Sequence, residues 1–214
     1  MEENRQILAD GFRADVAIDL SDDVINLLLD AAEPIIVPKR TYIIREGEYD
    51  SNMYITANGV TRISYFDGIK EVTLGFGGEA SVFVSPLGYV RRQPSNFSLI
   101  TVTDCDMLKV RKADLDELLR ESHELALWMF NLAMAQMDNL EFKLRDAQRT
   151  AKERYRDFLH RKDIEQFAAM NMRHVDIAKI VPDKVVASYL GVIPSHLSNI
   201  KKEIIDDERQ KPKE

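Results

Sequence analysis

The sequence predicts an α+β protein: a β-roll, then a long helix, then two short helices joined by a tight turn. Three observations lead to this prediction. Short apolar or alternating runs separated by turn residues fill residues 35–110. Residues 123–159 contain neither Gly nor Pro. Residues 183–202, DKVVASYLGVIPSHLSNIKK, place one glycine between two segments with a helical apolar pattern.

Composition and charge limit the classes of protein to which the chain can belong. The chain has 214 residues, 45% hydrophobic and 30% charged, which suits one or two domains with a real core. The net charge is −7, yet residues 150–214 hold 13 Lys and Arg against 11 Asp and Glu. The acidic excess therefore lies in residues 1–149, and any contact with a polyanion is expected at the C-terminal end.

Cysteine usage and hydropathy indicate the compartment. Cys105 is the only cysteine, which excludes an internal disulfide, a CxxC site and an all-cysteine iron–sulfur site. Residues 1–10 have neither the basic nor the apolar region of a signal peptide. The longest apolar run, residues 125–135, is too short to span a bilayer. We therefore expect a cytoplasmic protein with no membrane partner.

The first predicted element is a helix over residues 20–32. Ser21 is the candidate N-cap, two acidic residues follow it, and apolar residues recur at helical spacing from Val24 to Leu28. The two prolines in EPIIVPKR then end the pattern.

Eight short runs indicate strands between residues 35 and 110. They read IIVP, TYII, MYITA, VTRISYF, EVTLGF, ASVFV, FSLITVT and MLKV. Glycine-containing turns such as ANG, FDG and GFGGE separate them. Short strands at this spacing are typical of a jelly roll or barrel, whose interior holds either a ligand or side chains.

A long helix follows a short one at KADLDELLRES, residues 112–122. Its apolar stripe consists of Met129, Ala133, Met137, Leu140, Leu144, Ala147 and Ala151. A helix of roughly 28 residues would be about 40 Å long, which exceeds the width of a small β domain. One interpretation is a core helix of a single domain. The other, which we favour, is a dimer seam formed by Met129, Ala133, Met137, Leu140 and Leu144.

Short helical segments are predicted after residue 160, namely KDIEQFAAM, HVDIAKI, KVVASYL and SHLSNIKKEIIDDE. We therefore divide the chain into a β-roll domain (1–120), a dimerisation helix (121–150) and a C-terminal domain (151–214).

The last two helices meet the requirements of a helix-turn-helix. Ala187 is small enough for a close helix crossing, Gly191 tolerates positive φ in the turn, and Pro194 is acceptable in a first helical turn. The residues expected to be buried are Val186, Leu190, Val192, Leu197 and Ile200. Those predicted to face DNA are Ser195, His196 and Asn199 at base edges and Lys201 and Lys202 at phosphates. A plain helical hairpin is the alternative.

The layout resembles the Crp/Fnr family of transcription regulators. The likeness is strongest at residues 181–202 and extends to REGEYDSNMYITANGVTRI (45–63) and GFGGE (75–79). It implies a cyclic-nucleotide-binding-like jelly roll and a winged-helix-like helix-turn-helix domain. It also implies a homodimer that reads a palindromic site, with double-stranded DNA, RNA polymerase and a small-molecule effector as partners.

The likeness also suggests an effector pocket, with one departure. Its candidate residues are Gly77, Gly78, Glu79, Arg91, Arg92 and Ser95. Relatives that bind cyclic AMP clamp the phosphate with an Arg-Ser pair, whereas Pro94 or Ser95 stands where that arginine is expected. Without a bidentate arginine the phosphate loses its main charge-assisted partner, so we predict that cyclic AMP is not bound. Glu79 either holds a sugar hydroxyl or is simply an acid that is exposed or lies at the edge of the core.

The reading helix departs from the family as well. Asn199 replaces the usual arginine, and Pro194 and Ser195 occupy first-turn positions that often carry Arg or Glu. Asparagine pairs best with adenine, so a different base preference is expected unless Asn199 is only a solvated residue.

The sequence therefore predicts a DNA-binding transcription regulator. The alternative is a sensor or protein-interaction module that keeps the β-roll but has lost specific DNA readout. We find no catalytic constellation, metal site or cofactor motif, and expect no enzyme activity. The four histidines, His123, His160, His174 and His196, are interpreted as exposed or hydrogen-bonded rather than as haem ligands.

Overall fold

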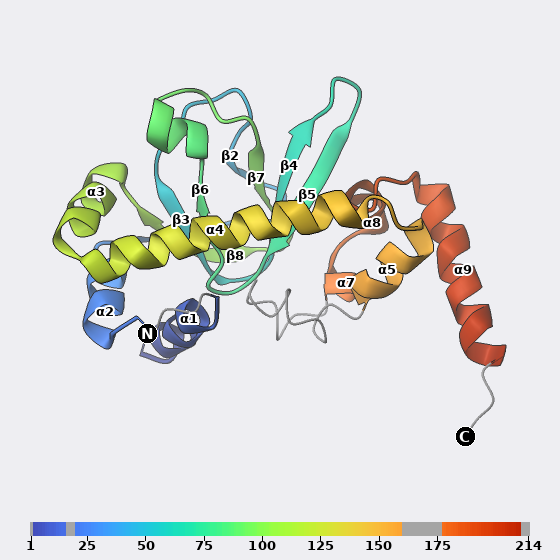
Figure 1. Ribbon diagram of the computed structural model, residues 1–214, viewed down its shortest axis with the longest axis horizontal. Coiled ribbons are helices and arrows are strands. Elements are labelled where there is room, and N and C mark those ends of the chain that lie inside the picture. Colours follow the sequence, from blue (N-terminus) through green and yellow to red (C-terminus); the bar gives the residue numbers. More distant parts are fainter. Residues whose placement is uncertain (1, 16–19, 160–176, 211–214) are drawn as a thin grey trace.

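The computed structural model describes residues 2–15, 20–159 and 177–210 (Figure 1). The predicted helix at 162–170 and the first residues of the one at 174–180 lie outside these ranges. The helices are α1 (Glu2–Asp15), α2 (Asp22–Asp30), α3 (Lys112–Glu121), α4 (His123–Asp146), α5 (Ala151–Leu159), α7 (Ile177–Ile180), α8 (Asp183–Tyr189) and α9 (Pro194–Gln210). One π-helical turn is η1 (Leu87–Arg91).

The predicted β-roll is confirmed. Its strands are β1 (Glu33–Val37), β2 (Tyr42–Ile44), β3 (Met53–Asn58), β4 (Thr61–Phe66), β5 (Glu71–Gly77), β6 (Val82–Val84), β7 (Ser98–Thr101) and β8 (Cys105–Val110). They form two antiparallel four-stranded sheets, in the orders β1-β8-β3-β6 and β2-β7-β4-β5. Each of the eight apolar runs forms a strand, because short alternating segments between glycine turns satisfy both faces of a sandwich.

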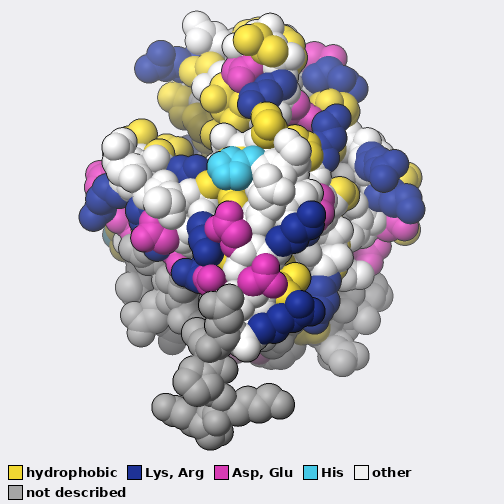
Figure 2. Space-filling model, turned by 90° about the vertical axis from the view of Figure 1, so that its right-hand side faces the viewer, with side chains coloured by type: hydrophobic (Ala, Val, Ile, Leu, Met, Phe, Trp, Pro, Cys, Tyr) yellow, Lys and Arg dark blue, Asp and Glu magenta, His cyan; other side chains and the backbone are white. Residues whose placement is uncertain are grey.

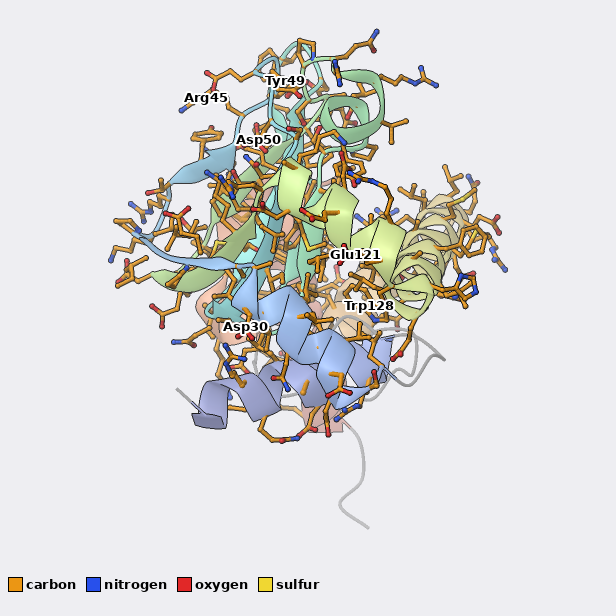
Figure 3. The ribbon with its side chains drawn as sticks, turned by 90° about the vertical axis from the view of Figure 1, so that its left-hand side faces the viewer. Asp30, Arg45, Tyr49, Asp50, Glu121 and Trp128 are labelled. Atoms are coloured by element: carbon orange, nitrogen blue, oxygen red, sulfur yellow. The ribbon has the colours of Figure 1, made fainter. Side chains whose placement is uncertain are left out.

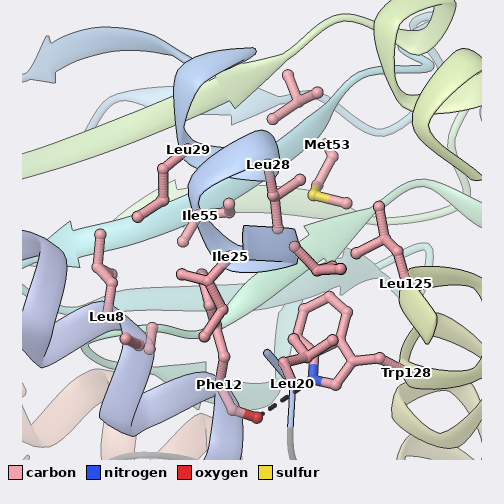
Figure 4. Close-up of a cluster of buried hydrophobic side chains, with 14 of the residues drawn as sticks. Leu8, Phe12, Leu20, Ile25, Leu28, Leu29, Met53, Ile55, Leu125 and Trp128 are labelled. Atoms are coloured by element: carbon pink, nitrogen blue, oxygen red, sulfur yellow. Dashed lines mark hydrogen bonds between the residues drawn. The ribbon is translucent and has the colours of Figure 1, made fainter. Parts of the chain in front are cut away.

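The main core lies between the first sheet and helices α1, α2 and α4 (Figure 4). Trp128 is fully buried at its centre, and its indole N–H donates to the carbonyl oxygen of Phe12 at 3.1 Å. The two rings meet edge to face with centroids 5.4 Å apart. This contact ties the long helix to α1, an element that the sequence pattern did not predict.

The N-terminus of α2 is anchored differently from the prediction. Ser21 is the N-cap, but its hydroxyl forms no capping bond to the helix. Instead its backbone N–H and its hydroxyl both donate to the carboxylate of Glu124. Ser21 therefore links α2 to α4.

The long helix is shorter than predicted. It ends at Asp146, and residues 147–150 turn the chain into α5. Thr150 and Glu153 form a reciprocal capping box: the Thr150 N–H donates to the Glu153 carboxylate at 2.9 Å, and the Glu153 N–H donates to the Thr150 hydroxyl at 3.3 Å. Ala147 and Ala151 consequently do not extend the apolar stripe of α4.

A second core joins the C-terminal helices to the β-roll. Phe76 on β5 is buried among the rings of Phe158 and Tyr189, with centroids 6.1 and 5.4 Å away. Next to it, the Ser188 hydroxyl of α8 accepts from the Thr73 N–H at 2.9 Å and donates to the Glu71 carbonyl at 3.0 Å. Because β5 is an edge strand, Ser188 satisfies backbone groups that would otherwise lack a partner.

This docking gives a stability prediction. Phe76→Ala should lower the free energy of unfolding by about 3–5 kcal/mol, because it removes a buried ring shared by both parts of the molecule. Urea denaturation measures the decrease. Phe66→Ala is the control, since that ring is exposed and its removal should cost about 0.5 kcal/mol or less. Equal decreases in the free energy of unfolding of the two variants would contradict the packing of the C-terminal helices on the β-roll.

Candidate nucleic-acid interface and effector site

The turn between α8 and α9 has the predicted form. Gly191 adopts φ +68°, the left-handed region, and nothing lies within 4 Å of where its side chain would be. Glycine is therefore required there for its backbone conformation and not for space. The Val192 N–H donates to the Ala187 carbonyl at 2.9 Å, which closes the end of α8.

The packing of the two helices also follows the prediction. Val186, Leu190, Leu197 and Ile200 are buried in the second core together with Ala187. Val192 is half-buried against the same cluster. The spacing of three and four along each helix therefore identified the faces that meet.

The opposite face of α9 is polar and open. Ser195, His196, Asn199 and Lys202 are all exposed. Figure 2 looks onto the α9 end of the molecule, where Lys and Arg side chains lie around a histidine and acidic side chains are interspersed. Ser195, His196, Asn199 and Lys202, which we call the reading face, lie in the first half of α9.

Lys201, which was predicted to contact a phosphate, has an ionic partner within the protein. Its ammonium group forms an ion pair with Asp183 on α8 and lies 6.0 Å from the centre of the Tyr155 ring. The side chain is thus held between α8, α9 and α5. The neighbouring Lys202 is exposed.

Two acidic residues of α9, Glu203 and Asp207, form ion pairs with α5. Asp207 pairs with Lys152 at 3.0 Å and with Arg156, and Glu203 pairs with Lys152 at 3.2 Å. The hydrogen bond from Lys152 holds the pKa of Asp207 below its ordinary value. Because this charge is neutralised within the protein, it opposes an approaching polyanion less than the net charge implies.

The candidate effector residues belong to two segments of the chain, the loop after β5 and the segment from η1 to Ser95. Gly77 and Gly78 lie at the end of β5 in a tight loop, where the Gly78 N–H donates to the Ser81 hydroxyl at 3.0 Å and Ala80 takes φ +59°. A side chain on Gly77 would clash with the Phe83 ring. Packing alone therefore accounts for glycine at this position. Glu79 is half-buried in the same loop.

The arginines suggested as a replacement for the phosphate clamp differ from Ser95 in burial. Ser95 is buried, and its hydroxyl donates to the Phe97 carbonyl at 2.8 Å. Arg91 and Arg92 are exposed at the end of η1, and Arg92 adopts φ +53°.

The turn η1 is fixed by a close backbone approach. A side chain on Gly88 would overlap the Asp50 carbonyl oxygen, so only glycine fits. Figure 3 shows Asp50, with Arg45 and Tyr49, in the loop at one end of the β-roll, away from Trp128 and Asp30. The Tyr89 hydroxyl donates to Asp116 at 2.6 Å and anchors the turn to α3.

The predicted seam helix has one buried and one exposed apolar face. Met129, which was predicted to lie in the seam, is half-buried and packs against the main core. Phe130, Met137, Leu140 and Leu144 are exposed by 62%, 57%, 57% and 73%. Met134 is also exposed, as is Ala133. Phe130 and Met134 were not part of the predicted stripe, whereas Met137, Leu140 and Leu144 were.

The described residues offer no metal site and no membrane span. No group of three or more His, Cys, Asp or Glu in the described chain is placed to hold a metal ion. Within residues 2–15, 20–159 and 177–210, no helix has the length and apolar character needed to cross a membrane.

The β-roll is similar to known proteins. Residues 34–122 match the family described as "Cyclic nucleotide-binding domain". The potassium channel AKT2 of Oryza sativa subsp. japonica is 27% identical over 132 residues, which are 59% of this chain but 15% of that protein. The chain therefore corresponds to a small part of this curated relative.

Solved structures share the fold over most of the chain. The global regulator CLP of Xanthomonas campestris has a TM-score of 0.69 at 16% identity, covering 91% of this chain and 96% of CLP. FixK2 of Bradyrhizobium japonicum gives 0.68 at 16%, covering 83% and 86%. The catabolite activator protein of Thermus thermophilus gives 0.53 at 16%, covering 88% and 85%. Over most of its length the chain therefore has the same fold as these three proteins.

Proposed function

We propose that the protein is a homodimeric transcription regulator that binds palindromic double-stranded DNA through α9. The observation that carries this proposal is the reading face. Leu197 and Ile200 fix α9 against α8 while Ser195, His196 and Asn199 remain open on the first turns. A helix-turn-helix places these turns in the major groove.

The exposed face of α4 supports the dimer. Phe130, Met137, Leu140 and Leu144 follow each other at spacings of seven, three and four, so they share one face of the helix. A contiguous apolar face on a surface helix marks an interaction site, and two copies of the same face are self-complementary. A dimer about this helix would present two copies of α9 to one DNA duplex.

The roles within α9 differ. We propose that Asn199 contacts a base edge with Ser195 and His196 nearby, while Lys202 contacts a phosphate. Lys201 instead holds α8 to α9 through Asp183. RNA polymerase is the expected protein partner of such a regulator, and an effector is expected to bind the β-roll.

The effector is proposed not to be cyclic AMP. The position of the expected clamp holds Ser95, whose hydroxyl already donates to Phe97. CLP is described as a global regulator responsive to c-di-GMP, so the fold is compatible with other effectors.

Calorimetry tests the effector proposal. Titration with millimolar cyclic AMP should give no saturable heat, because Ser95 and not an arginine occupies the position of the expected phosphate clamp. Micromolar binding that Glu79→Ala abolishes would contradict this. If Arg91→Ala or Arg92→Ala abolished such binding, that arginine would be the substitute clamp.

A salt titration tests the function. Affinity for duplex DNA should fall steeply with salt, by a slope of about 0.9 for each phosphate neutralised, and a specific site should outcompete random DNA. Weak binding without any sequence preference would favour the alternative, a sensor or interaction module that has lost DNA readout.

A further inference from the structure

Ile193 occupies the N-cap of α9. The helix begins at Pro194, and the Leu197 N–H donates to the Ile193 carbonyl at 3.1 Å, the first bond of the helix. An N-cap side chain normally supplies an oxygen to the free N–H groups of the first turn, which isoleucine cannot do. The residue is therefore a poor choice for the helix itself.

Ile193 is also exposed, although its side chain is apolar. Its side chain is 62% exposed, whereas the neighbouring Val192 packs against the second core. Pro194 and Ser195, which follow, are exposed as well. A residue that neither caps its helix nor packs in a core is expected at positions where function determines the residue type.

Base edges in the major groove offer one apolar group, the C5 methyl of thymine. We propose that Ile193 contacts this methyl group and selects thymine at one position of each half-site. This inference rests on the proposed function, since it requires that the start of α9 enters the major groove. The uncharged side chains of Pro194 and Ser195 leave that approach free of charged groups.

The thymine contact is separate from the contact made by Asn199. The two residues are six positions apart, or about 9 Å along a helix axis. That distance corresponds to about two to three base pairs of stacked DNA at roughly 3.4 Å each. Each residue should therefore control its own position in the half-site.

Replacement of thymine by deoxyuridine tests the inference, because it removes only the methyl group. Each thymine of a site selected by the wild-type protein is replaced symmetrically, and dissociation constants are measured. Affinity should fall at one symmetric position by about fourfold per half-site, or about fifteenfold for both, which is the value of one buried carbon.

Two variants test whether Ile193 causes the difference in affinity between thymine and deoxyuridine. Ile193→Ser should remove the difference between thymine and deoxyuridine at that position. It should also raise the melting temperature, because serine caps the helix and replaces an exposed apolar side chain. Ile205→Ser, at an exposed isoleucine three turns further along α9, should keep the difference.

The outcomes separate this inference from the proposed function. Specific binding with no response to deoxyuridine, or a response that persists in Ile193→Ser, would overturn the thymine contact and leave the regulator intact. A fall in the melting temperature of Ile193→Ser would show that the side chain packs within the fold and would also overturn it. Absence of any specific binding would remove the proposed function and the inference together.

Discussion

Leu140→Asp is expected to convert a dimer of twice the 24.6 kDa chain mass into a monomer. Leu140 lies at the middle of the exposed face of α4, between Met137 and Leu144. In a dimer two aspartates would meet in an apolar seam without a cationic partner, which costs several kcal/mol. Light scattering across a range of concentrations measures the mass.

Val90→Asp is the matched control for this dissociation. Val90 is an exposed apolar residue on η1, so the variant gains the same charge away from α4. It should remain dimeric. A wild-type protein that is monomeric at high micromolar concentration, or a Leu140→Asp variant that stays dimeric, would contradict the seam.

Asn199→Ala is expected to cost about 1–3 kcal/mol at one symmetric pair of base positions and to leave the others unchanged. The reason is that an amide pairs with one base edge, and adenine offers the matching donor and acceptor. Competition binding against each single-base variant of the selected site resolves the position. A uniform decrease across all variants would show that Asn199 does not read a base.

The two neighbouring lysines provide the comparison. Lys202→Ala should weaken binding to all sequences alike and flatten the salt slope by about one unit for each phosphate that is no longer neutralised. Lys201→Ala should instead loosen the packing between α8 and α9, because Lys201 pairs with Asp183. An equal change of salt slope in both variants would contradict this division of roles.

The β-roll and the paired helices were predictable because their signals are local. Alternation between glycine turns marked each strand, and Gly191 with its flanking apolar residues marked the turn before α9. Glycine at a position that requires positive φ is a strong signal, since few other residues adopt that conformation.

The break of the long helix also has a local signal, which the prediction did not use. Thr150 and Glu153 have the spacing of a capping box, but an unbroken run without Gly or Pro suggested continuity. Helix α1 was not predicted because its sequence contains a glycine, which disfavours a helix. Gly11 lowers its helix propensity by about 1 kcal/mol, and packing of Phe12 against Trp128 compensates.

Long-range contacts could not be predicted from one sequence. The bonds of Ser188 to Glu71 and Thr73 join residues more than a hundred positions apart, and no periodicity indicates them. The same holds for Lys201, which resembles a phosphate ligand beside Lys202 in the sequence, whereas the fold places Asp183 next to it. Side-chain type and helical position alone do not determine the partner.

Selection from random duplex DNA tests the central claim most directly. The wild-type dimer should enrich a two-fold symmetric sequence whose half-site centres lie one helical turn apart, about 10–10.5 base pairs, or a multiple of it. The half-site should contain the base pair that Asn199→Ala ceases to select. A folded, dimeric protein that enriches no sequence over the input library would contradict the account.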